Sequence, residues 1–209
     1  MARPQLDQSA CDKLTECVRE IESATDAELV IVVHARSGSY RSADYLCGAI
    51  AAFAALLFLL FDAYEFHLYL IPVVVALVFI AGALICSRSN ALRRLLTSEK
   101  YRAEVVRTHA AAMFFEAGIA NTQSEMGILV YLSLLERRLE TIADRGVLKA
   151  APPLEWNKRL SELIEAGHRP ELESLLRSLR AMGNLLAEHL PATGENPNEL
   201  PDMPQFDLK

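Results

Sequence analysis

Three acidic residues flank the stretches that predict β-strands: Glu28, Glu125 and Asp144. The strands are predicted at Leu29–Val33, Gly127–Ser133 and Arg138–Ala143. If the first two are parallel and the third runs back, all three carboxylates reach one end of the sheet. Carboxylate oxygens bind Ca²⁺ and Mg²⁺ and can also transfer protons. We therefore predict a Ca²⁺ or Mg²⁺ site there, with Asp26 close by as a further binding residue. The alternative is purely structural, with solvated loop carboxylates and a turn cap at Asp144.

The opposite end of the sheet is an equal candidate, because parallel sheets more often bind ligands at the carboxyl ends of their strands. The sequence offers four polar residues for that end: Ser37, Ser39, Asp44 and Ser133. Among them Asp44 is predicted as a binding residue. By contrast, the turn that begins at Glu136 is predicted to be solvated.

The surrounding elements predict a three-layer α/β/α domain with a small mixed sheet. Leu29–Val33 is too apolar for an exposed strand and is predicted to be central and parallel to Gly127–Ser133. Arg138–Ala143 follows a short turn and is predicted to be antiparallel. Helices are predicted at four stretches: Ser9–Thr25, Leu92–Ala117 as the crossover, Leu154–Glu165 and Glu171–His189. The Pro-rich tail 191–209 is predicted to be irregular.

Two apolar runs, Leu46–Phe61 and Leu68–Cys86, interrupt this domain. The second run would form a helix of ~28 Å, about the hydrocarbon thickness of a bilayer. Gly48 and Gly82 would let two such helices approach closely. We therefore predict a transmembrane hairpin at 44–87, with spans at about 45–61 and 68–86. It separates a first part of the domain (1–43) from the remainder (88–190) and the tail (191–209).

Charges predict the orientation of the hairpin. Lys and Arg residues flank both runs, whereas the connecting loop carries none. The positive-inside rule then places the flanks, the α/β domain and both termini in the cytoplasm. The N-terminus also lacks the apolar core of a signal peptide. These features predict a multi-pass protein of the inner (plasma) membrane.

The overall composition bears on the function. The net charge of −6 and the lack of a basic stripe argue against nucleic-acid binding. The four cysteines have neither a Cys-x-x-Cys pair nor zinc-site spacing, and the five histidines share no metal-ligand spacing. No Gly-x-Ser-x-Gly nucleophile motif is present.

Three segments resemble the TPM domain family: Asp26–Val33, Met126–Gly146, and Leu186–Pro191 with Asn198–Asp202. That family includes a thylakoid lumen phosphatase-like protein, a photosystem II repair factor, a nematode receptor modulator and a bacterial membrane branch, which the third segment resembles. The resemblance implies an α/β/α domain. It also implies either an assembly or regulatory role, or acid phosphatase activity or calcium binding.

Two functions follow as hypotheses. The first is a membrane-anchored module that binds, assembles or regulates a membrane protein partner. The second is a divalent-metal-dependent, phosphatase-like hydrolase that uses the carboxylates described first. The absence of a recognised catalytic motif favours the binding module.

Overall fold

The computed structural model describes residues 8–62, 67–122, 124–168, 171–194, 199–200 and 203–207. The chain forms two compact units, one comprising Met1–Ser37 with Ala103–Lys209 and the other Gly38–Arg102. We call the first the α/β unit and the second the hairpin unit. Glu65 of the predicted loop, and Asn198, Pro201 and Asp202 of the TPM-like tail segment, lie outside the described residues.

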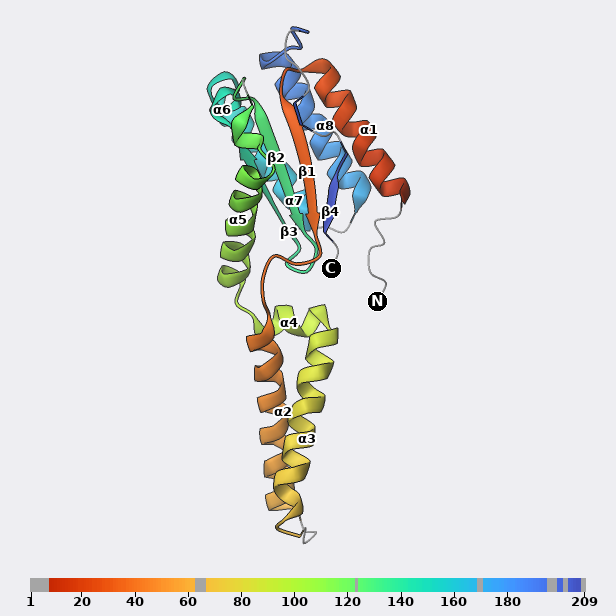
Figure 1. The fold of residues 1–209 in the computed structure, drawn as a ribbon, viewed down its shortest axis with the longest axis vertical. Helices are drawn as coiled ribbons and strands as arrows, with labels where there is room; N and C mark the ends of the chain where they lie inside the picture. Colours follow the sequence, from red (N-terminus) through yellow and green to blue (C-terminus); the bar gives the residue numbers. More distant parts are fainter. Residues whose placement is uncertain are drawn as a thin grey trace. The chain divides into compact units, whose positions relative to one another are not determined.

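The α/β unit contains a four-stranded mixed sheet in the order β3-β2-β1-β4 (Figure 1). Its strands are β1 (Glu28–His34), β2 (Gly127–Ser133), β3 (Arg138–Ala143) and β4 (Gln205–Asp207). β1 and β2 are parallel, with Leu29 opposite Ile128. β3 runs antiparallel to β2, with Ala143 opposite Ile128. The predicted mixed sheet is therefore confirmed, with the predicted directions of its first three strands.

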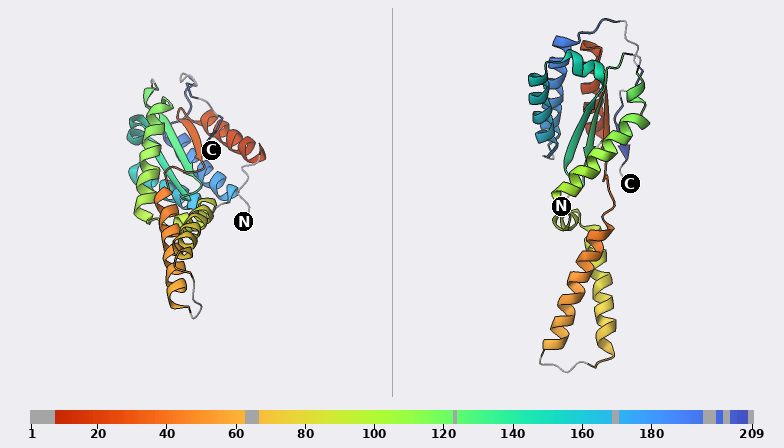
Figure 2. Two further views of the ribbon diagram at one scale, coloured as in Figure 1. Left: turned by 60° about the horizontal axis from the view of Figure 1, so that its bottom comes forward. Right: turned by 90° about the vertical axis from the view of Figure 1, so that its left-hand side faces the viewer.

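Helices cover both faces of this sheet, as the predicted three-layer architecture requires (Figure 2). Leu29, Ile31 and Val33 pack into a core shared with α1 (Gln8–Ala24), α7 (Pro153–His168) and α8 (Leu172–His189). The alternate residues Val30 and Val32 pack with residues of α5 (Glu99–Glu116) on the other face. Because successive strand side chains point to opposite faces, a strand buried between two helical layers must be apolar at every position. This explains the unbroken aliphatic run of β1.

Three local predictions need correction. The single helix expected at Leu92–Ala117 is two helices, α4 (Asn90–Leu96) and α5. The break occurs because Thr97 is extended and the Ser98 hydroxyl accepts a hydrogen bond from the Tyr101 N–H at 3.3 Å, which starts α5.

A further helix, α6 (Arg145–Ala150), follows β3 without having been predicted. The tail is also not wholly irregular, since its strand β4 pairs in parallel with β1, with Val32 opposite Gln205. Both elements are too short to produce a periodic sequence pattern.

The hairpin unit contains α2 (Arg41–Phe61), α3 (Leu70–Arg88) and α4. The helices α2 and α3 are long and apolar enough to cross a membrane. They approach closely at two glycines, as predicted: a Cβ on Gly48 would lie 2.7 Å from the Phe79 carbonyl oxygen, and one on Gly82 would lie 3.0 Å from the Ala51 Cβ. Any larger residue would push the two helices apart.

Candidate functional site

The three predicted carboxylates do reach one end of the sheet. Glu28 lies opposite Gly127 in the β1–β2 register, and the Asp144 N–H donates to the Gly127 carbonyl oxygen at 2.9 Å. Glu125 is next to them, where its carbonyl oxygen accepts a hydrogen bond from the Gly146 N–H at 2.9 Å. Strand direction alone was therefore enough to bring these residues to a common end.

Asp144, Asp26 and Glu28 each have a local structural role. Asp144 caps α6, accepting from the Arg145 N–H at 2.7 Å. Asp26 accepts from the Thr193 N–H and hydroxyl at 2.9 and 2.8 Å. Glu28 is buried and accepts from the Glu199 N–H at 3.3 Å. Desolvation by burial raises the pKa of the Glu28 carboxyl.

One oxygen of Glu28 (Oε2) and one of Asp144 (Oδ2) are buried without a hydrogen-bond partner. Even so, the described part of the chain contains no group of three or more His, Cys, Asp or Glu side chains that could hold a metal ion. The Ca²⁺ or Mg²⁺ site at this end therefore stays a prediction for which the structure supplies no ligand group.

The carboxyl ends of β1 and β2 carry a buried polar cluster: Ser37, Tyr131, Ser133 and Glu136. The Ser37 hydroxyl donates to the Ser133 Oγ at 2.8 Å, and the Ser133 hydroxyl donates to the Glu136 carboxylate. The other carboxylate oxygen accepts from the Ser37 N–H at 2.9 Å. The Tyr131 hydroxyl lies 2.8 Å from the Ser37 Oγ.

These contacts fix the direction of the hydrogen bonds. A serine hydroxyl has one hydrogen, and that of Ser37 is already given to Ser133, so Tyr131 must donate to Ser37. The chain of donors runs from Tyr131 through the two serines to the Glu136 carboxylate. Burial raises the pKa of the Tyr131 phenol, which keeps the phenol protonated as this chain requires.

The cluster supports one side of a pocket in the α/β unit. The ring of Tyr131 packs on that of His34, with 5.2 Å between the ring centroids. His34 in turn faces a pocket of about 470 Å³. The pocket lies between the end of β1, the helix α5 and the edge strand β4, and it is lined by His34, His109, Ala112, Met113, Glu116, Gln205, Phe206 and Asp207.

The polar lining of the pocket contains two histidines, His34 and His109, and two carboxylates, Glu116 and Asp207. Burial lowers the pKa of His34, the Asp207 carboxylate opposes this, and His109 adds to it. The lowered pKa favours the neutral form of His34 at pH 7. The pocket can accept a ligand that carries hydrogen-bond donors or positive charge, with apolar contacts from Met113 and Phe206.

Comparisons with known proteins give information on the fold but not on the function. No family model matches the chain, and no curated protein matches it. The NMR structure of the BA42 protein from the psychrophilic bacterium Bizionia argentinensis is similar in fold, with a TM-score of 0.57 and 12% sequence identity. The match covers 97% of this chain and 95% of that chain.

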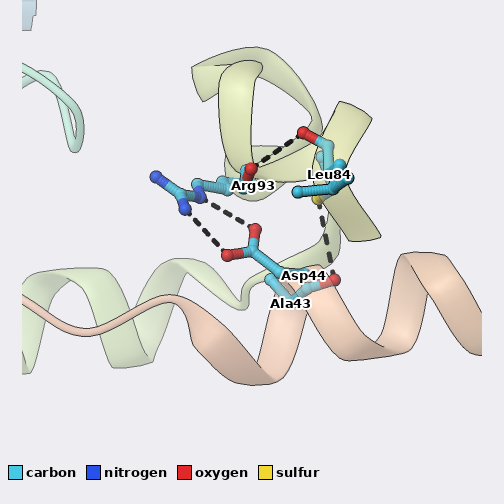
Figure 3. A network of polar contacts seen from close by, with 6 residues as sticks. Ala43, Asp44, Leu84 and Arg93 are labelled. Carbon is cyan, nitrogen blue, oxygen red and sulfur yellow. Dashed lines mark hydrogen bonds and ion pairs between the residues drawn. The ribbon is translucent and has the colours of Figure 1, made fainter. Parts of the chain in front are cut away.

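Asp44, predicted for the carboxyl end of the sheet, belongs to the hairpin unit. Its carboxylate accepts two hydrogen bonds from the Arg93 guanidinium, at 2.9 Å to Oδ1 and 2.7 Å to Oδ2 (Figure 3). The ion pair joins the first turn of α2 to α4, and the two side chains are only 11% and 12% exposed. Beside this ion pair, the Cys86 thiol of α3 donates to the Ala43 carbonyl oxygen of α2 at 3.7 Å.

Sequence reasoning placed Ser37 and Ser133 at the correct end but missed their partners. Glu136 was expected in a solvated turn and is instead 2% exposed. Arg137 adopts a positive φ of 52°, so the chain turns sharply after Glu136, whose side chain lies inside against the two serines. One signal was present: Ser133 is a polar residue that closes an apolar strand, and a buried hydroxyl needs a partner.

Proposed function

We propose that this protein is a multi-pass membrane protein of the inner (plasma) membrane that presents a binding module to a membrane protein partner. The hairpin α2–α3 is its anchor, and the α/β unit with the pocket at the end of β1 is the module. We further propose that the module is of the TPM type, on the strength of the sequence segments at β1 and at the β2–β3 turn.

The surface of the hairpin supports the anchor. Large apolar side chains cover the outside of both helices, among them Phe58 at 63% exposed and Leu77 at 61% exposed. Leaving apolar surface in water costs about 25 cal/mol per Å². A bilayer removes that cost, and the positive flanks then favour a cytoplasmic α/β unit and cytoplasmic termini.

The polar cluster supports a structural role for its two serines and not a nucleophilic one. Ser37 and Ser133 are buried, and both hydroxyls are engaged within the cluster. A nucleophile must reach its substrate, so these serines act as a rigid frame for the pocket wall. The observation that carries the proposed binding role is this preformed pocket, with its two histidines and two carboxylates, held by a satisfied buried network.

Topology is tested with two reporter fusions in a bacterial host, one after Lys209 and one inserted beside His67. We expect a cytoplasmic reading from the first and a periplasmic reading from the second. The reverse pattern would refute the orientation, and loss of the protein from carbonate-washed membranes would refute the anchor.

Binding is tested by placing a photoreactive amino acid at Met113, which lines the pocket, in intact membranes. The matched control places it at Leu154, which is 85% exposed on α7. We expect a discrete cross-linked product from Met113 that weakens with Glu116→Gln and is not formed from Leu154. Equal products from both positions would contradict a specific site at the pocket.

A further inference from the structure

The end of the hairpin unit nearest α4 is strongly basic in an otherwise acidic chain. Residues 38–48 and 86–102 contain six basic residues and two acidic ones, whereas the net charge of the whole chain is −6. The basic residues are Arg41, Arg88, Arg93, Arg94, Lys100 and Arg102. The stretch 62–67 at the other end of the hairpin has no Lys or Arg. The positive charge is therefore confined to one end of the two apolar helices.

The helix α4 lies across that end of the hairpin, at a steep angle to α2 and α3 (Figure 1). The change of direction occurs at Ser89, which is extended and whose hydroxyl accepts from the Leu92 N–H at 3.4 Å. The bidentate bond from Arg93 to Asp44 then fastens α4 to α2. Hydrogen bonding to Asp44 raises the pKa of Arg93, so the guanidinium stays charged. If α2 and α3 cross a bilayer, α4 lies along its surface.

The residues around α4 have the composition of a membrane interface. Leu95 is 80% exposed on α4, and the nearby Tyr45 and Tyr101 are also exposed. Tyr101 packs edge-on against the buried Tyr40, with 6.3 Å between ring centroids. Tyrosine is enriched at the level of lipid headgroups, and an exposed leucine on a surface helix can enter the acyl boundary.

We propose that α4 and the adjoining helix ends form a docking surface for anionic phospholipid headgroups. Arg41, Arg88 and Lys100 are exposed and contact lipid phosphates, while Leu95 enters the bilayer. The Asp44–Arg93 pair holds α4 in place for this contact. The inference rests on the proposed function, because it requires that the hairpin spans a membrane.

The test uses the full-length protein, purified in detergent and titrated with phosphatidylglycerol or phosphatidylcholine, with bound lipid read by native mass spectrometry. We expect phosphatidylglycerol to bind at least tenfold more tightly. The combined variant Arg41→Gln, Arg88→Gln and Lys100→Gln should lose about fivefold in affinity for each charge removed, roughly hundredfold in all. The matched control removes three exposed charges of the α/β unit: Arg145→Gln, Lys158→Gln and Arg177→Gln.

Two further measurements distinguish lipid binding at this surface from simple attraction of a phosphate ion. Leu95→Gln leaves the charge unchanged and should weaken phosphatidylglycerol binding several-fold. Inorganic phosphate should compete poorly, and effective competition would overturn a membrane lipid as the ligand. Equal affinity for both lipids, or equal loss in the control variant, would overturn the proposal. If the protein is retained in carbonate-washed membranes but shows no lipid preference, this inference fails and the anchor stands.

Discussion

Replacing Glu136 by glutamine tests whether the buried cluster supports the pocket. The carboxylate accepts from the Ser37 N–H at one oxygen and from the Ser133 hydroxyl at the other. Glutamine keeps one acceptor and turns an NH₂ donor toward one of these donors. The change removes a hydrogen bond to a charged group and leaves a buried donor without an acceptor. Each of these losses costs about 1–3 kcal/mol, which relief of the buried charge partly offsets.

We therefore expect Glu136→Gln to lower the free energy of unfolding of the α/β unit by about 3 kcal/mol. Ser133→Ala should cost about 2 kcal/mol, because Glu136 and Ser37 each lose a partner. Tyr131→Phe should cost only about 1 kcal/mol, because Ser37 keeps its acceptor and loses just one donor. The order of the three costs follows directly from the direction of the hydrogen bonds.

Chemical unfolding in detergent, followed by the fluorescence of Trp156, measures these costs. Trp156 is the single tryptophan and is 6% exposed in the core beneath the sheet, so it reports on the α/β unit alone. Glu188→Gln, at an exposed glutamate of α8, is the matched control and should change stability by less than about 0.5 kcal/mol. A cost of Glu136→Gln no greater than that of Tyr131→Phe would refute the assigned network.

Three other predictions concern the pocket and the hairpin. Burial lowers the pKa of His34, so the unfolded chain takes up a proton before the native chain as pH falls below ~6.5. Stability should therefore decrease below that pH and be level above it, and His34→Gln should flatten the decrease in unfolding curves measured at several pH values. Asp44→Asn leaves a partly buried guanidinium without its charged partner, which should lower the free energy of unfolding by about 3 kcal/mol. Because Cys86 is buried beside this pair, its thiol should then react at least tenfold faster with a small permeant reagent, as measured by mass spectrometry. Gly48→Leu would force a side chain against the Phe79 carbonyl oxygen and cost about 1–3 kcal/mol. Cross-linking between α2 and α3 in membranes should then fall, whereas unchanged cross-linking would contradict the close approach.

Local patterns were sufficient for most of the fold. The predicted strands Gly127–Ser133 and Arg138–Ala143 match β2 and β3 residue for residue, and their short link required the antiparallel pairing. β1 extends the predicted run by one residue at each end. β1 and β2 are predictable because burial on both faces demands apolar residues along almost the whole strand. β3 is predictable because it follows β2 after a short turn.

Elements determined by a single hydrogen bond or by a distant partner were not predictable. The break between α4 and α5 depends on one serine cap at Ser98, inside a stretch with continuous helical periodicity. The strand β4 has three residues and exists because β1 offers an unpaired edge. Neither the Ser98 cap nor the three-residue strand β4 has a sequence pattern that differs from that of ordinary loops.

In the candidate sites, too, features set by local sequence were predictable, whereas contacts between distant residues were not. By itself the sequence determined that Glu28, Glu125 and Asp144 share one end of the sheet, because strand direction decides which ends meet. It also determined that two apolar helices pack through Gly48 and Gly82, since only small residues permit that approach.

Only the tertiary structure decided that Glu136 is buried against Ser37, a residue 99 positions away, and that Asp44 pairs with Arg93. The pocket at the end of β1 likewise requires α5 and the tail to meet beside His34. Such contacts join residues that are far apart in the sequence, and composition and periodicity describe only residues that are close together in it.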